Sequence, residues 1–543
     1  MSEKVDSDAR KRGLPAVLLL GVLVALVHGA CVRPGHTWWG MDDYTAYLVH
    51  GRNILEGLPY TDIDTVHDPG LPPSFQRTAF PPAFSLLVGL VDRSIRSGAE
   101  QHALAQAGDQ PFDTDALHDD PRRRGGLDLV PLKRVLALIM GASVVAVFFA
   151  MRRTTHSVPL ALGLLGFAAS PYLFAFKELV RSEMAFVLLA YLWMGMVQYT
   201  ERRERDGHRT YLLAVAAGLV MGLAYATRTA AVVLPPALIT ADLLRHRKLR
   251  MSSIISLGVA GALIFGQRAA FASVEGGYVG KAVQEWGTAT LVENAQQLSW
   301  NAMRIWENGF STVLQQALAV GFVLLMLIGL VDRLRKPTVV EVFVLGYMTM
   351  IFLLPTDSAW MRYLIPALPF ALICAFSGAR LLGRWMPGQA VPLWAASVLL
   401  FGTYASAYAH MDHGPLRDGL SAPETVEVFE WVEQHTGPDE VVIFQKWRTL
   451  SLATGRPSTS YPQIFRHGEL PDDELWQHFR RIGAVAFVLK HTPPTESNLF
   501  RMLNHSDQGF LERFVAKYPE HFDEKLRNDE FVVYELRGYP PGT

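Results

Sequence analysis

The sequence predicts an α-helical polytopic membrane protein that carries a small α/β domain at its C-terminal end. Half of the 543 residues are hydrophobic, only 19% are charged, and the mean hydropathy is +0.17. That composition is too apolar for an ordinary soluble protein. Apolar stretches of membrane-spanning length recur through residues 1–409, whereas residues 410–543 alternate short helix-like and strand-like patterns.

The apolar stretches number about eleven, judged against the roughly 20 residues that a helix needs to cross the hydrocarbon core. The first follows Lys11 and Arg12 and has features of a signal peptide. Its length and the many later stretches favour a retained signal-anchor instead. The stretches run over residues 14–32, 130–151, 157–174, 184–199, 211–226, 229–244, 252–268, 313–331, 338–355, 362–380 and 390–408.

Residues 80–91 form a further apolar segment, whose length of about twelve residues suits an interfacial or re-entrant piece better than a span. If this segment does not cross the membrane, the short loops on one side of the membrane hold about fifteen Lys and Arg residues. The loops on the other side hold roughly six. This positive-inside bias predicts a cytoplasmic N-terminus, a first outer loop over about residues 33–130 and an extracytoplasmic C-terminal domain. Lys133 and Arg134 run against the bias, because they flank a span on the outer side. We expect an integral protein of the inner, or plasma, membrane.

The sequence predicts two domains, a membrane domain over residues 1–409 and a C-terminal domain over residues 410–543. In the second, apolar residues at helical spacing and short β-like runs follow one another, as in a small α/β domain. Helices are predicted over residues 423–436, 472–482 and 511–518, and strands over residues 441–444, 484–489 and 531–536.

Composition and motifs argue against several classes of function. The net charge of −1 offers no basic field for nucleic acid. The two cysteines, Cys31 and Cys374, both lie in apolar stretches, so we expect no disulfide framework. The chain contains no HExxH, paired CxxC or GxSxG motif, so the sequence gives no protein-only metal site and no hydrolase triad. No cofactor is predicted, and use of a divalent cation is left open.

Two adjacent acids, Asp42 and Asp43, follow the first apolar stretch and precede a helical pattern that ends at Gly57 and Pro59. Either carboxylate can cap that helix by accepting free N–H groups of its first turn. Capping needs only one acid, however. The other is therefore available as a general base at the membrane surface.

Charged residues also mark the outer ends of other predicted spans. Arg228 interrupts an apolar run and indicates either a tight turn or a functional charge, and its apolar surroundings favour function. Arg362 opens a stretch beside aromatic residues and is either a membrane anchor or a ligand. The second outer loop forms either a solvated loop with local ion pairs or part of a site, and contains Lys177, Glu178, Arg181 and Glu183.

The predicted topology places these acidic and basic groups at one depth. Acids and arginines at an outer membrane face suit an anionic, lipid-borne substrate. An Asp would accept a proton from an acceptor hydroxyl, and arginines would hold a phosphate in two-pronged contacts.

In this arrangement the chain resembles the GT-C superfamily of membrane glycosyltransferases, which includes the protein O-mannosyltransferases, the lipid A aminoarabinose transferase and the oligosaccharyltransferase catalytic subunit. Family members carry an acid pair in the first outer loop, then a Tyr-containing surface helix that ends in Gly, then a Pro-Pro element. The resemblance covers nearly the whole membrane part and rests on the order and topology of short motifs. The matching segments are Asp42-Asp43, Tyr47 to Gly57, Pro81-Pro82, Ala169 to Glu183 and Arg362 to Pro369.

The resemblance implies an inverting transfer of sugar from a polyprenyl-phosphate donor to an acceptor hydroxyl of a protein, lipid or polysaccharide. Spacing to Tyr47 and Gly57 makes Asp43 the counterpart of the family's catalytic Asp, with Asp42 or Glu183 in support. Because Glu183 stands where some branches have Asp, metal use stays open. The expected partners are the lipid-linked donor, the membrane lipids and an acceptor that the sequence does not identify.

The resemblance also implies cationic contacts to the donor. Arg228 and Arg362 are the expected phosphate ligands. Some relatives have Lys just before Pro-Pro, where Phe80 stands here, so Arg77 or another cation would take that role. The full set of expected substrate-binding residues is Arg228, Arg362, Lys177, Arg181 and Arg77.

Two other classes of function remain as alternatives. A transporter or flippase of lipid-linked sugars would place charged residues deep within helices and would not require Asp43. A non-catalytic membrane scaffold that presents the C-terminal domain would leave the clustered charges replaceable.

Overall fold

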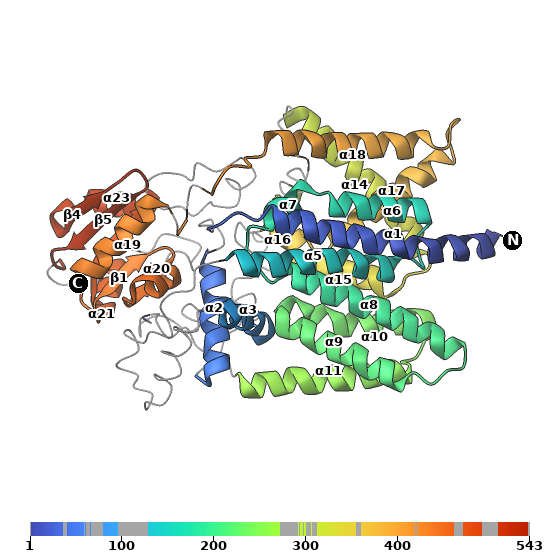
Figure 1. Ribbon diagram of the computed structural model, residues 1–543, viewed down its shortest axis with the longest axis horizontal. Helices are drawn as coiled ribbons and strands as arrows, with labels where there is room; N and C mark the ends of the chain where they lie inside the picture. Colours follow the sequence, from blue (N-terminus) through green and yellow to red (C-terminus); the bar gives the residue numbers. More distant parts are fainter. Residues whose placement is uncertain are drawn as a thin grey trace.

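The computed structural model describes residues 2–35, 41–58, 80–95, 129–271, 312–353, 360–416, 422–460, 471–490 and 509–540, together with a few single positions between them. A helical bundle makes up most of the molecule, and a small sheet with its own helices lies at one end of it (Figure 1). The N-terminus lies at the opposite end of the bundle (Figure 1).

The bundle helices coincide with the predicted apolar stretches, and two of the stretches each cover parts of two helices, α6 with α7 and α16 with α17. Six segments of the described chain are long and apolar enough to cross a membrane, namely Gly13–Ala30, Val130–Met151, Ser157–Phe176, Met251–Ala270, Thr312–Leu334 and Val391–His410. The count of eleven crossings stays a prediction. The helices are α1 (Ser2–Ala30), α5 (Val130–Met151), α6 (Ser157–Ala168), α7 (Pro171–Phe176), α8 (Glu183–Arg205), α9 (Tyr211–Thr227), α10 (Leu234–His246), α11 (Met251–Ala270), α14 (Thr312–Leu334), α15 (Val339–Leu353), α16 (Trp360–Leu364), α17 (Leu368–Gly383) and α18 (Val391–His410), with a 3₁₀ turn at Thr229–Val233.

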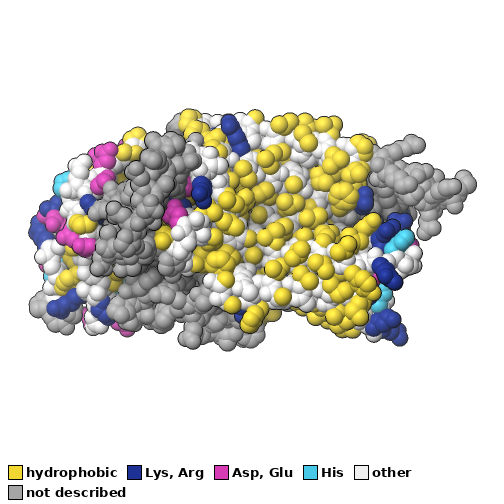
Figure 2. Space-filling view, turned by 60° about the horizontal axis from the view of Figure 1, so that its bottom comes forward, with side chains coloured by type: hydrophobic (Ala, Val, Ile, Leu, Met, Phe, Trp, Pro, Cys, Tyr) yellow, Lys and Arg dark blue, Asp and Glu magenta, His cyan; other side chains and the backbone are white. Residues whose placement is uncertain are grey.

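The surface of the bundle is that of an integral membrane protein. Figure 2 shows a broad band of hydrophobic side chains over the helices, with charged side chains gathered toward the two ends. Exposed apolar side chains of the bundle helices include Leu212, Phe265 and Val313. Apolar side chains that face lipid rather than water incur no hydrophobic penalty, which accounts for so much exposed apolar area.

Two helices lie across the end of the bundle, between it and the C-terminal region (Figure 1). They are α2 (Met41–Glu56) and α3 (Pro82–Ile95). With 14 residues, α3 is too short to cross the hydrocarbon core, which agrees with the sequence-based expectation for this segment. A buried ion pair joins the two helices, because Arg52 Nε and Nη2 lie 2.9 and 3.0 Å from the Asp92 carboxylate oxygens.

Glycines allow α2 and α3 to cross closely. A Cβ atom on Gly51 would lie 2.1 Å from the carbonyl oxygen of Ser85, and one on Gly89 would lie 2.6 Å from the carbonyl carbon of Gly51. Neither position has room for a larger residue. The close crossing fixes the orientation of α2, which carries the predicted acid pair.

The C-terminal region is a mixed sheet between two layers of helices. The strand order is β2-β1-β3-β5-β4; β1 is parallel to β2 and β3, and β5 is antiparallel to β3 and β4. Helices α19 and α20 share a core with one face, and α21 and α23 with the other. The elements are α19 (Pro423–His435), β1 (Val441–Phe444), α20 (Trp447–Thr454), β2 (Ser458–Thr459), α21 (Asp472–Ile482), β3 (Ala484–Lys490), α23 (Gly509–Lys517), β4 (Phe522–Arg527) and β5 (Phe531–Leu536).

This region packs directly on α2. Tyr44, Tyr47 and Leu48 of α2 belong to the same buried apolar cluster as Phe429 and Leu450 of the C-terminal helices. Thr45 Oγ1 and Thr449 Oγ1 lie 3.1 Å apart across the contact. The helix that carries the acid pair is therefore held between the bundle and the sheet region.

Candidate active site

Asp43 lies in the first turn of α2 and contacts two arginines. Its Oδ2 is 2.7 Å from Arg362 Nη1 and 3.0 Å from Arg181 Nη1. Arg362 comes from the short helix α16, and Arg181 from the loop between α7 and α8. The carboxylate is about one-fifth exposed, so a second molecule can reach it. Charge-assisted contacts of this length are among the stronger polar interactions in proteins.

Glu183, the first residue of α8, is buried beside this pair. Its Oε1 is 3.0 Å from Arg228 Nη1 and 3.8 Å from Arg362 Nε. Arg228 is in an extended conformation where α9 ends and the 3₁₀ turn begins, so the tight turn and the polar contact occur at the same residue. Three guanidinium groups thus converge on two carboxylates, which leaves an excess of positive charge.

Aromatic side chains and a serine surround these charges. The guanidinium carbons of Arg228 and Arg362 lie 5.3 and 4.9 Å from the Tyr363 ring centroid, within the range of cation–π attraction. Ser182 Oγ accepts a hydrogen bond from Arg228 Nη1 and hydrogen-bonds with the Tyr47 hydroxyl, both at 3.3 Å. Burial, and then the negative charges of Asp43 and Glu183, raise the pKa of Tyr47 well above its ordinary value, so its hydroxyl stays protonated.

The described part of the chain contains no group of three His, Cys, Asp or Glu side chains that could hold a metal ion. The two carboxylates of the site face guanidinium groups instead. A divalent cation bound between Asp43 and Glu183 would have to displace arginines from both. This donor set therefore fits an anion better than a metal ion.

Protein-family models and the curated proteins give no match to the chain. Solved structures do. The archaeal oligosaccharyltransferase AglB from Archaeoglobus fulgidus, in complex with an inhibitory peptide and a dolichol-phosphate, superposes with a TM-score of 0.56 at 12% identity, over 87% of this chain and 69% of that one. ArnT from Cupriavidus metallidurans bound to undecaprenyl phosphate superposes with a TM-score of 0.53 at 12% identity, over 95% of this chain and 97% of ArnT.

The chain has the fold that AglB and ArnT share. Because both likenesses extend over most of this chain, they include the bundle and the C-terminal region together. The fold expected from the resemblance in the sequence is therefore confirmed.

Within this fold, five of the predicted site residues come together at one end of the bundle. They are Asp43, Glu183, Arg181, Arg228 and Arg362.

Of the other predicted residues, Lys177 is described by the structure and does not join this group. Lys177 lies in a neighbouring cluster, where its Nζ is 2.7 Å from Glu178 Oε1 and 3.9 Å from the Phe174 ring centroid. Arg77 and the side chain of Asp42 lie outside what the structure describes.

Sequence reasoning did not assign Tyr47, Ser182 or Tyr363 to the site. Each stood next to a predicted site residue or in a quoted motif, but a single Ser or Tyr is too common to indicate a role. Their contacts depend on segments that are distant in sequence, such as the 3.3 Å contact between Tyr47 and Ser182. Only the fold brings these segments together.

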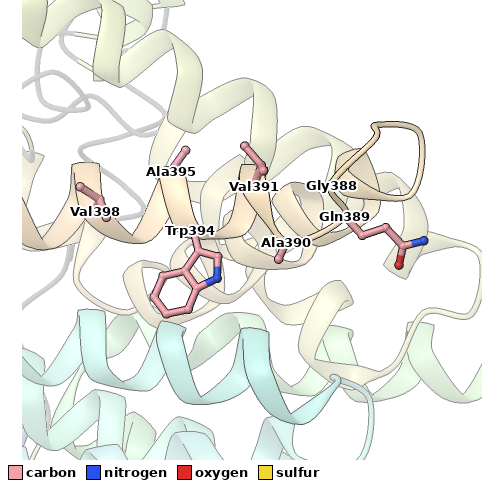
Figure 3. Close-up of a pocket in the computed structure, with 7 residues that line it drawn as sticks. All are labelled: Gly388, Gln389, Ala390, Val391, Trp394, Ala395 and Val398. Atoms are coloured by element: carbon pink, nitrogen blue, oxygen red, sulfur yellow. The ribbon is translucent and has the colours of Figure 1, made fainter.

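An apolar hollow elsewhere on the molecule is far from the charged residues of the candidate site. It is shallow and lies at the turn from α17 to α18, at the end of the bundle opposite to α2 (Figures 1 and 3). Trp394 and Val398 of α18 project beside it (Figure 3). The hollow contains no charged side chain, so it offers nothing for general acid or base catalysis.

Proposed function

We propose that this chain transfers a sugar from a polyprenyl-phosphate-linked donor to an acceptor hydroxyl at the outer face of the membrane, with inversion at the sugar. The observation that supports this best is the contact of Asp43 with Arg181 and Arg362, beside the Glu183–Arg228 pair. A carboxylate and an excess of guanidinium groups at the membrane surface are what proton abstraction and phosphate departure require.

In the proposed step, the acceptor oxygen attacks the anomeric carbon from the face opposite the phosphate. A new carbon–oxygen bond forms while the bond between the anomeric carbon and the phosphate oxygen breaks. Asp43 accepts the hydroxyl proton, and the bonding electron pair leaves with the lipid phosphate. Arg228 and Arg362 are the proposed ligands of that phosphate, with Arg181 as a further contact.

The ion pairs of Asp43 affect the order in which donor and acceptor would bind. Asp43 Oδ2 faces both Arg181 and Arg362, which compete with an acceptor hydroxyl for the same oxygen. A phosphate carries more negative charge than a carboxylate and offers more acceptor oxygens. Donor binding would therefore draw guanidinium groups from Asp43 and make its Oδ2 available to the acceptor. Donor would then bind before acceptor in a productive cycle.

Two further observations support the proposal. The similar structures of AglB and ArnT were solved with dolichol-phosphate and undecaprenyl phosphate respectively. The N-terminus and the C-terminal region lie at opposite ends of the bundle (Figure 1), in keeping with an odd number of crossings, for which we propose eleven. In that topology the Asp43 site would face outward in an inner, or plasma, membrane.

The proposal is tested by incubating the purified protein with polyprenyl-phosphate monosaccharides that carry a labelled sugar, together with membrane extracts as a source of acceptor. Transfer of label from the lipid to another molecule, with release of the free lipid phosphate, is the expected result. Asp439→Asn, a change at an exposed acid of the C-terminal region, is the matched control and should retain full transfer. Movement of the intact lipid-linked sugar across a vesicle membrane without cleavage would contradict the proposal and favour a flippase.

A further inference from the structure

A second cluster of charges is buried beside the Asp43 site, around Glu178. The side chain of Glu178 is fully buried, and its carboxylate oxygens lie 2.7 Å from Lys177 Nζ, 2.9 Å from Lys133 Nζ and 3.3 Å from Arg33 Nε. Lys133 is also fully buried. Although burial alone would raise the pKa of Glu178, the charges of Lys133 and Lys177 hold that pKa below its ordinary value. We call these four residues the Glu178 cluster.

The Glu178 cluster fixes the loop that enters the proposed active site. Glu178 precedes Arg181 by three residues and Glu183 by five. Arg181 contacts Asp43, while Ser182 hydrogen-bonds with Arg228. A shift of the buried Glu178 carboxylate would therefore move the residues that contact both sides of the site.

The same cluster contacts two segments of the chain, one that precedes α2 and one that precedes α19 in the sequence. Lys133 Nζ donates hydrogen bonds to the carbonyl oxygens of Arg33 and Gly35, at 2.9 and 2.7 Å, just after α1. Arg33 Nη1 donates to the carbonyl oxygens of Asp412 and Gly414, at 3.4 and 2.9 Å. These last two residues belong to the segment between α18 and α19 that leads into the sheet region.

We propose that Glu178 is a positioning residue, which holds Arg181 against Asp43 and, through Arg33, seats the C-terminal region on α2. The effect on transfer rests on the proposed function, whereas the seating of the C-terminal region does not. Burying one carboxylate with three cations is costly, and loss of the carboxylate leaves cations without compensation. Loosening of the loop and of the C-terminal region should follow together.

The packing of the C-terminal region on α2 can be measured without an assay of transfer activity, because Thr45 and Thr449 are in contact between the two parts. The probe is Thr45→Cys with Thr449→Cys in a chain where Cys31 and Cys374 are replaced by Ala. The rate of disulfide formation with diamide reports how well the C-terminal region is seated. We expect the rate of disulfide formation to fall about tenfold or more in Glu178→Gln and in Arg33→Gln. The second variant is the milder change, because Arg33 is partly exposed.

Glu341→Gln is the matched control. Glu341 is buried like Glu178 and pairs with Arg333, but it lies at the opposite end of the bundle, where α14 ends and α15 begins. We expect normal disulfide formation in this variant. Where transfer is active, Glu178→Gln should lower kcat about tenfold or more and also raise donor KM, because Arg181 is a proposed contact of the donor phosphate, and Glu178→Asp should restore part of both.

The outcomes separate the two proposals. Slower disulfide formation in both cluster variants, in a protein without transfer activity, would support the seating role while contradicting the proposed function. Unchanged disulfide formation in Glu178→Gln and Arg33→Gln would overturn the positioning proposal, whatever the activity. Equal slowing in Glu341→Gln would overturn it too, because the effect would then be a general loss of stability.

Discussion

Arg362 and Asp43 are 319 positions apart in the sequence, and Arg362 Nη1 donates a hydrogen bond of 2.7 Å to Asp43 Oδ2. The same guanidinium places its Nε 3.8 Å from Glu183 Oε1, so one side chain connects the two acids of the site. Arg228 approaches the same Glu183 oxygen to 3.0 Å. Arg228 and Arg362 are therefore close enough to bind one phosphate together.

Replacing either arginine should weaken use of the donor. We expect Arg228→Ala and Arg362→Ala to lower kcat/KM for the donor by about 10²-fold, the scale for loss of one fixed electrostatic group. The Lys variants should fall between Ala and wild type, because Lys keeps the charge but loses the two-pronged geometry. Donor kinetics at saturating acceptor give the measurement, and Arg268→Ala, at the exposed end of α11, is the control. An effect confined to acceptor kinetics would rule out the shared phosphate.

Removal of divalent cations should leave transfer intact. In the proposed mechanism arginines compensate the charge of the departing phosphate, and both carboxylates already face guanidinium groups. We expect equal initial rates before and after treatment with EDTA. Loss of activity that Mg²⁺ or Mn²⁺ restores would show that a metal ion takes part, and the roles of Arg228 and Arg362 would need to be reassigned.

The close crossing of α2 and α3 should be sensitive to a single methyl group. Gly51→Ala would place a Cβ atom 2.1 Å from the Ser85 carbonyl oxygen, so the two helices must move apart. Overpacking of this kind costs about 1–3 kcal/mol, and we expect a lower thermal unfolding temperature and reduced transfer. Gly258→Ala is the matched control, because nothing lies within 4 Å of its Cβ position. Equal stability of the two variants would contradict the described crossing.

The topology predicts that the two ends of the chain lie on opposite sides of the membrane. Reporter fusions after Thr200 and after Gly414 should report different sides, the first cytoplasmic. The reason is the excess of Lys and Arg in the loops at the N-terminal end of the bundle. Reporters on one side of the membrane would refute the outward orientation of the Asp43 site.

Much of the fold follows from patterns within short segments. Apolar length predicted where helices occur in the bundle. In the C-terminal region, helical spacing predicted α19 and α21, and short β-like runs predicted β1, β3 and β5, all close to their observed bounds. The edge strand β4 was missed, because Asp523, Glu524 and Lys525 give it no apolar alternation. The strand order depends on pairing between distant segments, so no local pattern contains it.

The candidate site shows the same division. A charge within an apolar run is costly without a partner, and this singled out Arg228. Arg362 and Glu183 were predicted from their places at the outer ends of spans and from the family resemblance. The sequence does not show which acidic and basic side chains form ion pairs with each other. Lys177 was therefore grouped with Arg181, although the buried Glu178 holds it in another cluster. Lys133 was counted against the predicted topology, because it is a cation at the outer end of a span. The structure shows that its side chain is fully buried and paired with Glu178.

Asp43 is the proposed acceptor of the proton of the acceptor hydroxyl, and single-turnover transfer from a labelled polyprenyl-phosphate sugar by Asp43→Asn tests this role most directly. Asn keeps the size of Asp but cannot take up a proton at neutral pH. We expect transfer to fall about 10²–10⁴-fold while donor binding, expression and membrane insertion stay near wild type. Asp42→Asn should retain most activity. Near-normal transfer by Asp43→Asn would contradict the account: an inactive Asp42→Asn would then identify the neighbouring acid as the base, and normal transfer by both variants would exclude either acid from that role.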